Sequence, residues 1–454
     1  MQTTRREFVS SLGGGLGMLG LTGYCMGEAS DALEKRGGTH FRPRAKRVIQ
    51  LFMNGGPFQA DLFDPKPALN QFAGQRPKEV EFRTENETGG VMPVPFGFAQ
   101  RGQCGLPVSD LLPRLGAQID RLCILRSLHT DNPNHGPALF MMNNGTIAPT
   151  RPSMGAWFSY GLGAENANLP GYVVLCPGRP VRFSELWSAA FLPGAYQGTY
   201  INHTELDPQK LVPFVRNGRL APEPQRRQLD LLQTMNRRHL GERQGEAALE
   251  ARIESLETAY RMQFAATDAF DIRQEPASIR AEYGTTHYAN ACLMARRLVE
   301  RGVRFVQVYY GNGQPWDTHR NHNQSTKDLC KDIDQPTAAL LEDLARRGML
   351  EDTLVIWCGE FGRTSTSEGG DGRDHNHLGF TGWLAGGGVR GGMAYGATDD
   401  FGFRAVQDKV HVHDLHATIL HLLGLDHERL TFRHAGRDYR LTDVYGRVVH
   451  DVIA

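Results

Sequence analysis

Residues 47–57 read Arg47-Val48-Ile49-Gln50-Leu51-Phe52-Met53-Asn54-Gly55-Gly56-Pro57. A short apolar run that ends in a glycine loop is typical of a buried strand in an α/β sheet. The same pattern returns at residues 303–310 and 353–358, and residues 121–128 and 172–175 have a similar composition. Helix-favouring stretches at 289–301 and 337–347 lie among the later strands. This alternation predicts an α/β fold with a mostly parallel central sheet and helices on both faces.

The rest of the sequence predicts one domain with two insertions. Residues 64–110 are rich in proline, glycine and polar residues with little periodicity, which indicates a loop-rich insertion. Residues 225–264 are charged and carry leucines at helical spacing, so we expect a helical insertion over about 205–285. The α/β domain is then expected over residues 41–454, after a signal and linker over residues 1–40.

The N-terminus reads Thr4-Arg5-Arg6-Glu7-Phe8-Val9 before a weakly apolar stretch at 10–23. This resembles a twin-arginine export signal, with a chance Arg-Arg pair ahead of a small buried helix as the alternative. No apolar stretch reaches the ~20 residues that a membrane-spanning helix needs. We therefore expect the twin-arginine export machinery as a partner, no stable membrane span, and a periplasmic or otherwise extracytoplasmic location.

Composition and missing motifs exclude several classes of protein. Lysine plus arginine equals aspartate plus glutamate, at 50 each, so no net charge favours nucleic acid. The seven cysteines include no Cys-x-x-Cys pair, which argues against a zinc knuckle or a disulfide framework. The chain also lacks the Gly-x-Ser-x-Gly elbow, the phosphate-binding Gly-Lys-Ser/Thr loop and the His-Glu-x-x-His helix, which argues against serine hydrolases, NTPases and common zinc proteases.

Acidic and histidine residues gather after the predicted strands. They comprise Asp317, His319 and His322 after strand 303–310, Glu360 after strand 353–358, and Asp374, His375 and His377 in a glycine-rich loop. Carboxylate and imidazole groups are ligands for zinc and similar divalent ions. Each group alone could be a solvated loop or, for Glu360 with Arg363, a structural ion pair. Their convergence at the ends of neighbouring strands predicts a shared site, where Arg363 could grip a phosphate or sulfate group.

Residues 410–424 contain four more histidines. Asp414 is well placed to cap a helix there, whose apolar face is formed by Leu415, Ile419, Leu422 and Leu423. Structural capping is therefore the favoured interpretation, and His413 is only a weak candidate ligand.

Together these motifs resemble the family known as domain of unknown function 1501, which is grouped with the alkaline phosphatase and sulfatase superfamily. The resemblance covers nearly the whole chain. It is carried by the double arginine, Asn54-Gly55-Gly56-Pro57, Asp61-Leu62-Phe63-Asp64-Pro65-Lys66-Pro67, Trp316-Asp317-Thr318-His319, Gly359-Glu360-Phe361-Gly362-Arg363-Thr364, Gly372-Arg373-Asp374-His375 and the stretch from Asp414 to Gly424.

The resemblance implies an alkaline-phosphatase-like fold and metal ligands at stated positions. Asp317 with His322 or His319 would form one ligand pair, Glu360 would supply a carboxylate, and His375 or His377 would close the site. Asp374 would ligate or orient that histidine, and Phe361 falls where a ligand would stand. Asp61 is a displaced early carboxylate. The expected nucleophile position near Asn134-His135 has no serine, threonine or cysteine, and Thr130 is the nearest hydroxyl.

Two functions remain open from the sequence. The first is an exported hydrolase of a small-molecule or polysaccharide phosphate or sulfate ester, dependent on a divalent metal such as zinc, calcium, magnesium or manganese. In it Arg363 clamps the anion, and His135 or Thr130 assists proton transfer or attack. The second is a metal- or ligand-binding scaffold of the same fold that has lost catalysis.

Overall fold

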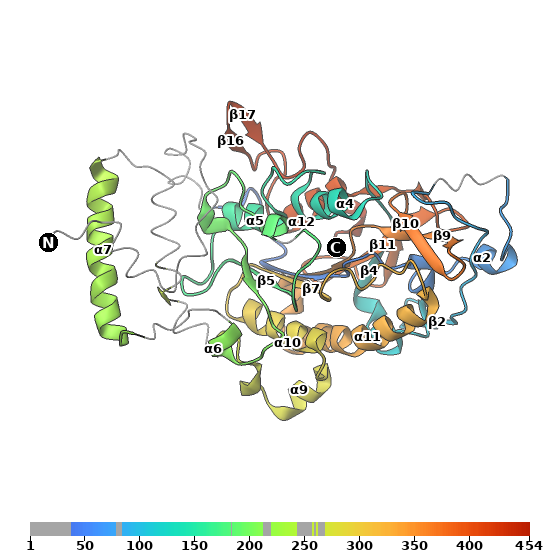
Figure 1. The fold of residues 1–454 in the computed structure, drawn as a ribbon, viewed down its shortest axis with the longest axis horizontal. Helices are drawn as coiled ribbons and strands as arrows, with labels where there is room; N and C mark the ends of the chain where they lie inside the picture. The colour runs from blue at the N-terminus through green and yellow to red at the C-terminus, as the bar shows by residue number, and fades with distance from the viewer. Residues whose placement is uncertain are drawn as a thin grey trace.

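The computed structural model describes residues 38–78, 84–182, 184–211, 219–242, 257, 260–261 and 268–454. Its centre is a nine-stranded sheet in the order β12-β4-β11-β8-β1-β7-β5-β6, with β15 also beside β4 (Figure 1). The strands are β1 (Arg47–Phe52), β4 (Leu122–His129), β5 (Tyr172–Leu175), β6 (Thr199–Ile201), β7 (Phe305–Tyr309), β8 (Thr353–Cys358), β11 (Phe380–Ala385), β12 (Met393–Tyr395) and β15 (Val410–His411). Among these described strands, only β11 pairs antiparallel with its neighbours.

Helices cover both faces of the sheet. One face is covered by α10 (His287–Glu300) and α11 (His322–Arg346), and the other by α4 (His135–Asn144), α5 (Met154–Leu162) and α12 (Val412–Leu422) (Figure 1). The shorter helices are α2 (Pro67–Gln71), α3 (Pro113–Gly116), α6 (Pro208–Leu211) and α9 (Ala277–Tyr283), and α7 (Pro222–Glu242) stands apart from the sheet. Small two-stranded sheets pair β2 (Phe98–Arg101) with β3 (Leu106–Ser109), β9 (Gly362–Glu368) with β10 (Gly372–Asn376), β13 (Ala397–Thr398) with β14 (Ala405–Gln407), and β16 (Phe432–His434) with β17 (Arg437–Tyr439).

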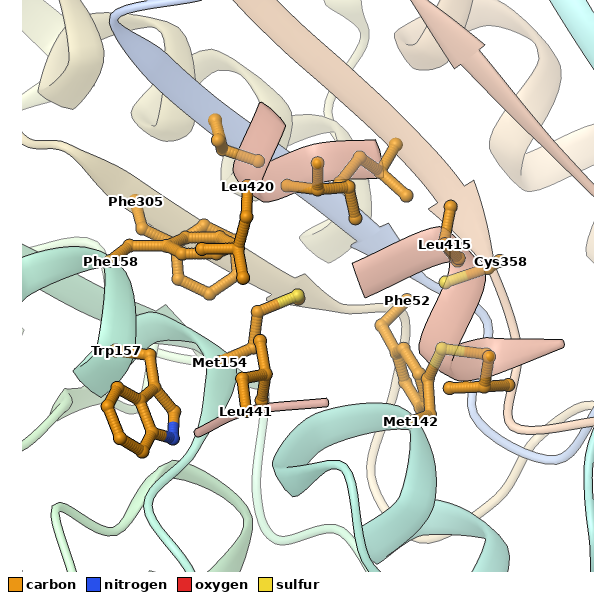
Figure 2. Packing of buried hydrophobic residues seen from close by; sticks show 14 of the residues in the cluster. Phe52, Met142, Met154, Trp157, Phe158, Phe305, Cys358, Leu415, Leu420 and Leu441 are labelled. Carbon is orange, nitrogen blue, oxygen red and sulfur yellow. The ribbon is translucent and has the colours of Figure 1, made fainter. Parts of the chain in front are cut away.

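Strand β1 explains why the sheet has two cores. Side chains alternate along a strand, so Val48 and Phe52 pack under α4, α5 and α12, whereas Ile49 and Leu51 pack under α10 and α11. Figure 2 shows Phe52 among the aromatic, methionine and leucine side chains of the first core. Because Phe52 is fully buried, its replacement by alanine would cost about 3–5 kcal/mol.

A buried polar chain fixes α4 to the sheet. Gln307 on β7 donates from Nε2 to Gln50 Oε1 at 3.1 Å and to Asn143 Oδ1 on α4 at 2.6 Å. Its Oε1 accepts from the Tyr172 hydroxyl at 2.8 Å. Buried amides without partners are costly, so these contacts hold α4 in one register on the strands. They thereby fix the position of His135, the first residue of that helix.

The structure confirms the predicted fold class and each of the five predicted strands. The predicted start of the helix at 337–347 was wrong, because α11 begins at His322 and continues through Pro336. A proline removes one helical hydrogen bond, but the buried inner face of α11, including Ile333 and Leu340, outweighs that loss.

Several predictions fall on residues that the structure does not describe. The predicted export signal lies outside the described residues, as does most of the predicted helix beyond Glu242. The described part of the predicted 64–110 insertion contains α2, β2 and β3. Strand β2 pairs with β3 and not with the main sheet. In the described part of the chain, no helix combines the length and apolarity needed to cross a membrane.

Candidate metal centre

The candidate site lies at one edge of the sheet. Because β4, β8, β1 and β7 point the same way, their carboxyl ends meet there, together with the amino end of antiparallel β11. His135 follows β4, Asp317 follows β7, Glu360 follows β8, and His375 precedes β11. Loops at the carboxyl ends of parallel strands are the usual place for a site in such sheets.

Two glycines allow the loops to approach closely. A Cβ atom on Gly55, whose φ is +115°, would lie 2.4 Å from the Asp317 backbone nitrogen. A Cβ atom on Gly372 would lie 1.8 Å from the His319 carbonyl oxygen. Both distances are far inside van der Waals contact, so only glycine fits. The 317–320 loop is therefore clasped between the end of β1 and the β9–β10 hairpin.

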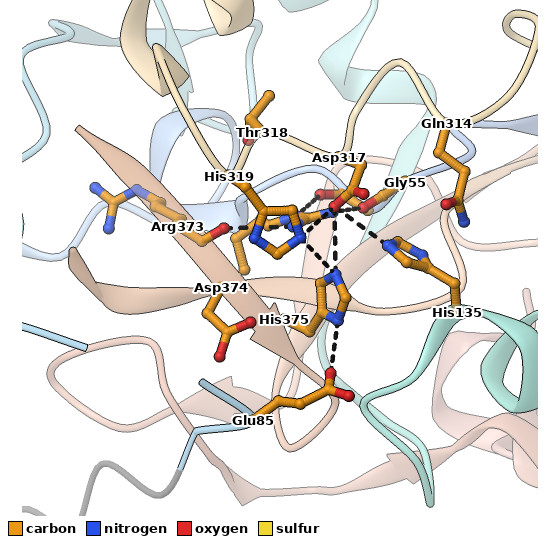
Figure 3. A network of polar contacts seen from close by, with 12 residues as sticks. Gly55, Glu85, His135, Gln314, Asp317, Thr318, His319, Arg373, Asp374 and His375 are labelled. Atoms are coloured by element: carbon orange, nitrogen blue, oxygen red, sulfur yellow. Dashed lines mark hydrogen bonds and ion pairs between the residues drawn. The ribbon is translucent and has the colours of Figure 1, made fainter. Parts of the chain in front are cut away.

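Three imidazoles converge on one carboxylate oxygen (Figure 3). The Nε2 atoms of His319, His135 and His375 lie 3.0, 3.2 and 3.3 Å from Asp317 Oδ1. The Nε2 atoms of His319 and His375 are themselves 3.0 Å apart. These four residues form a group whose potential metal-binding atoms all lie within 4.8 Å of one another. The start of α4, the loop after β7 and the hairpin strand β10 thus deliver four ligand atoms to one point.

Each imidazole is held from behind by its own carboxylate. His135 Nδ1 is 2.7 Å from Glu360 Oε1, and His375 Nδ1 is 2.8 Å from Glu85 Oε2. His319 Nδ1 contacts Glu368 Oε2 in the same way. Since a carboxylate only accepts hydrogen bonds, each Nδ1 carries the proton. A neutral ring then presents its Nε2 lone pair to the centre, as metal-binding histidines do when a carboxylate holds the other nitrogen.

The donor atoms fit a bound cation better than they fit each other. Facing at 3.0 Å, the Nε2 atoms of His319 and His375 form a hydrogen bond only when one ring is protonated there and the other is not, since two lone pairs or two N–H groups at that distance repel. The buried Nε2 of His135 has no hydrogen-bond partner among the described residues, although it lies near Asp317. Four carboxylates, Asp317, Glu360, Glu368 and Glu85, surround the rings, with only one guanidinium, Arg363, ion-paired to them in the described residues. A divalent ion would relieve both the repulsion and the excess negative charge.

The protonation equilibria of the metal-free chain show the same charge imbalance. Burial opposes ionisation of Asp317, but the three imidazoles around it and the charge of Arg363 hold its pKa well below the ordinary value. The hydrogen bond to Asp317, helped by Glu368, raises the pKa of His319 to about 9. Burial lowers the pKa of His135, but its two carboxylate partners outweigh this and raise it. Protons therefore compete with any metal for these nitrogens.

Arg363 does not have the role predicted for it. Its side chain is fully buried, with Nε donating to the Gly56 carbonyl at 3.1 Å and a terminal nitrogen to the Gly55 carbonyl. The same terminal nitrogen lies 2.6 Å from Asp317 Oδ1, and the other donates to the Arg373 carbonyl at 3.3 Å. Four of its five N–H groups are engaged within the protein and the side chain is fully buried, so the guanidinium is not placed to clamp a substrate anion. Arg363 instead ties the loop after β1 to Asp317.

His322 and Asp61 are close together but outside the four-residue group. His322 Nε2 lies 2.7 Å from Asp61 Oδ2, and its Nδ1 lies 2.6 Å from the Thr318 hydroxyl. Both ring nitrogens are therefore engaged, and burial lowers the His322 pKa. The prediction that His322 pairs with Asp317 was wrong, because the ring turns to Asp61. It anchors Thr318, the neighbour of Asp317.

Asp374 holds the segment that carries Glu85. Its carboxylate is buried and accepts from the Asn86 backbone N–H at 2.7 Å and from Asn86 Nδ2 at 3.1 Å. Asp374 also falls in two further groups of close acidic and imidazole atoms, one with Glu85 and His375 and one with Glu368 and His319. Of the two predicted roles, the hydrogen bonds favour orientation.

The remaining predicted residues lie outside the four-residue group. His377 belongs to none of the close groups found in the described chain, and burial lowers its pKa. Its carbonyl accepts from the Thr130 N–H at 2.9 Å, while the buried Thr130 hydroxyl has no partner among the described residues. The His413 ring lies against the Gly145 carbonyl, with Nε2 at 3.0 Å. Asp414 helps to cap α12 as predicted, but from the third position of the helix, where it accepts from the His411 N–H at 3.0 Å in a capping box whose N-cap residue is His411.

Phe361 and two glutamates complete the site. The Phe361 ring packs on His135 and His375, with centroids 4.7 and 4.9 Å away, and so fixes both imidazoles without binding a metal. Sequence reasoning missed Glu85 and Glu368 and assigned His135 to proton transfer. The turn Glu368-Gly369-Gly370 is typical of a hairpin, and this local pattern could have drawn attention to Glu368. No local pattern marks Glu85, which lies 290 positions from His375 in the sequence.

Solved structures similar to the chain include a sulfatase and an alkaline phosphatase. The PsFucS1 sulfatase from Pseudoalteromonas sp. is 11% identical with a TM-score of 0.37, over 84% of this chain and 68% of that one. The zinc complex of the C-terminal periplasmic domain of EcEptC from Escherichia coli is 9% identical with a TM-score of 0.35, over 87% of each chain. A TAB5 alkaline phosphatase mutant with magnesium bound is 8% identical with a TM-score of 0.34, over 85% of this chain and 99% of that one. At TM-scores below 0.5 these resemblances carry no weight for the chemistry of this chain.

Comparison with curated proteins finds no match. The family described as protein of unknown function (DUF1501) matches residues 45–453, which is nearly the whole chain. The match includes every residue of the centre, from Glu85 to His375. The chain therefore belongs to the DUF1501 family.

Proposed function

We propose that the chain binds a divalent cation through His135, His319, His375 and Asp317 and hydrolyses a phosphate or sulfate ester. The observation that carries the proposal is the set of three imidazoles that share one focus while each is held from behind by a carboxylate. A set of three imidazole nitrogens and one carboxylate oxygen suits zinc, whereas calcium and magnesium prefer oxygen ligands. Zinc is therefore the expected ion.

The chain's own residues would prepare the centre for this chemistry. A bound divalent ion would supply Lewis-acid polarisation of the ester and would lower the pKa of water. Glu360 fixes the His135 ring and accepts from the Gly55 N–H at 3.0 Å and from Gln314 Nε2 at 3.2 Å. Arg363 holds Asp317 at 2.6 Å. The amino end of α4, where His135 stands, favours negative charge on the ester.

The deciding experiment combines metal analysis with an ester panel. Purified protein loaded with zinc is assayed on p-nitrophenyl phosphate, bis-p-nitrophenyl phosphate and p-nitrophenyl sulfate, beside Asp317→Asn and His375→Gln. His421→Gln is the matched control, because His421 packs on Phe41 at 4.7 Å and lies outside the centre. Turnover should require zinc, survive in the control and fall at least about 100-fold in both site variants. Equal rates in all four proteins would refute the proposal.

A second function has its own supporting observation. The start of α4 offers His135 where a covalent nucleophile would stand, so the chain could bind metal without turnover. The scaffold hypothesis then predicts about one zinc ion per chain and no hydrolysis on the panel. Zinc-dependent turnover that is lost in Asp317→Asn would eliminate it.

We also infer export from the sequence at Arg5-Arg6. Pre-loading a metal before export suits the twin-arginine route, which carries folded proteins. Replacing both arginines by lysine should leave the protein inside the cell in a fractionation experiment, while a Lys46→Arg control is exported normally. Unchanged export of the double variant would contradict the inference.

A further inference from the structure

A second recess lies beside the candidate centre, on the side of α10. It is an open groove of about 820 Å³, within the size range of small-molecule sites. Gly311, Asn312 and Pro315 form one wall. The same loop carries Gln314, which bonds to Glu360, and then Asp317, so a single short loop separates the groove from the proposed metal.

The dividing loop is held firmly in place. Asn54 Nδ2 donates to the Gly311 carbonyl at 3.0 Å, and the Asn54 carbonyl accepts from the Trp316 N–H at 3.1 Å. The Trp316 ring is buried and packs edge-on against Tyr310, with centroids 6.0 Å apart. The wall of the groove is therefore as rigid as the centre beside it, and the two are set at a fixed separation.

The groove presents aromatic and neutral polar groups. Tyr310 is half-buried and packs on the buried ring of Tyr288 at 5.4 Å. Its hydroxyl donates to Asp332 Oδ2 at 3.0 Å, whereas Asp332 Oδ1 has no hydrogen-bond partner among the described residues. Asn290 and Thr285 add an amide and a hydroxyl to the lining. Amides and hydroxyls both donate and accept, while an unpaired carboxylate oxygen only accepts.

The charge of the lining does not favour an anion. Its ionisable side chains besides the tyrosines are Asp332 and His287, with no lysine or arginine, so the lining offers a second phosphate or sulfate group no permanent positive charge and one carboxylate that repels it. Asp332 Oδ1 is already buried without a partner among the described residues, so a ligand that brings a hydrogen-bond donor to it would satisfy it, whereas a purely apolar ligand would leave it unpaired. What remains is an uncharged ligand with several hydroxyl donors and an apolar face that can lie on Tyr310. Sugar rings have both properties.

We propose that the groove binds a sugar residue, so that the ester cleaved at the neighbouring centre is carried on a carbohydrate. The claim that the bound sugar carries an ester rests on the proposed function, whereas the claim that the groove binds a sugar does not. Tyr310 provides the stacking face, Asp332 accepts from ring hydroxyls, and Asn290 makes paired hydrogen bonds to neighbouring hydroxyls. His135, Asp317, His319 and His375 would hold the cation that binds the charged end of the same molecule.

The test is saturation-transfer NMR on the zinc-loaded chain. The probes are methyl glucoside, methyl galactoside, methyl fucoside and maltose, with adenosine as a stacking ligand of another class. Wild type is compared with Tyr310→Ala, with the near-isosteric Asp332→Asn in case the alanine variant folds poorly, and with Tyr445→Ala. Tyr445 is a matched control because it is 61% exposed and does not line the groove.

At least one sugar should show transfer that is weakened about tenfold in both groove variants and unchanged in the Tyr445 control. Absence of transfer to every sugar, equal transfer in the groove variants, or preference for adenosine would overturn the inference. Asp317→Asn separates the two proposals, because it should abolish hydrolysis and leave sugar binding intact. Sugar binding without any turnover would count against the proposed function alone, and turnover of p-nitrophenyl esters without sugar binding would count against the groove alone.

Discussion

Replacing Glu368 by glutamine isolates the contribution of one supporting carboxylate. Glu368 contacts His319 Nδ1, and glutamine keeps an oxygen that can accept the same proton while removing the charge. Loss of such a partner weakens metal binding about 10–100-fold, which corresponds to about 1.4–2.7 kcal/mol. Because the other two imidazoles keep Glu360 and Glu85, the centre should still bind zinc at full stoichiometry.

Proton competition gives this prediction a pH signature. With a pKa of about 9, His319 in the metal-free chain is mostly protonated at pH 7, which weakens apparent zinc binding about 100-fold relative to high pH. Removing Glu368 takes away one of the causes that raise this pKa. Proton competition at pH 7 therefore lowers the apparent zinc affinity of the variant less than that of the wild type. The two effects partly offset at pH 7, and the full loss of affinity should emerge near pH 9.

The assay is zinc competition against a chromophoric chelator at pH 7 and pH 9. Glu342→Gln is the matched control. Glu342 lies on α11, pairs with Arg121 at 2.7 Å and belongs to none of the close groups that contain the imidazoles. Glu368→Gln should weaken binding more at pH 9 than at pH 7, while the control follows the wild type. A variant that binds zinc as tightly as the wild type at pH 9 would refute the idea that the carboxylates support metal ligands.

Three further outcomes follow from the same contacts. His322→Gln should keep one zinc per chain by elemental analysis while His375→Gln loses it, because only the second ring points at the shared focus; loss of zinc in both would contradict this assignment. Arg363→Met should lower the free energy of unfolding in urea with chelator present by about 3–5 kcal/mol, since it removes the buried ion pair with Asp317 and the hydrogen bonds to the Gly55 and Gly56 carbonyls, and a cost below about 1 kcal/mol would speak against the ion pair. Burial lowers the pKa of His416 to about 3, so the unfolded chain binds an extra proton below about pH 6.5 and stability falls as the pH drops through that window. His416→Gln should flatten the slope of unfolding free energy between pH 6.5 and 4 by up to about 1.4 kcal/mol per pH unit, and an unchanged slope would count against a buried neutral ring.

Strands and their terminal loops could be predicted because their signals are local. The apolar run at 47–53 and the glycines after it specify a buried strand and its exit without reference to the rest of the chain. The same holds for strands 303–310 and 353–358, and this placed Asp317 and Glu360 at one edge of the sheet. The antiparallel strand β11 was not foreseen, because periodicity does not report strand direction.

Side-chain direction could not be predicted from the sequence. His319 and His322 are three positions apart and equally good ligands by type, yet one turns to Asp317 and the other to Asp61. The difference arises because α11 begins at His322, which turns that ring into the core. Arg363 was misjudged for a related reason, since its place after strand 353–358 suggested a guanidinium directed at a ligand, whereas the contacts at Gly55 bury it completely.

The chemistry open to the centre follows from what its hydroxyls and imidazoles already do. His135 stands at the start of α4 with Nδ1 on Glu360 and Nε2 at the focus, so it has no free nitrogen for attack or proton transfer. The Thr318 hydroxyl is bound to His322, the Thr364 hydroxyl donates to the Thr366 carbonyl, and the Thr130 hydroxyl, unpartnered among the described residues, is buried outside the four-residue group. Solvent is then the nucleophile that this constellation favours, and hydrolysis by direct attack of water inverts the configuration at phosphorus, whereas a covalent intermediate would retain it.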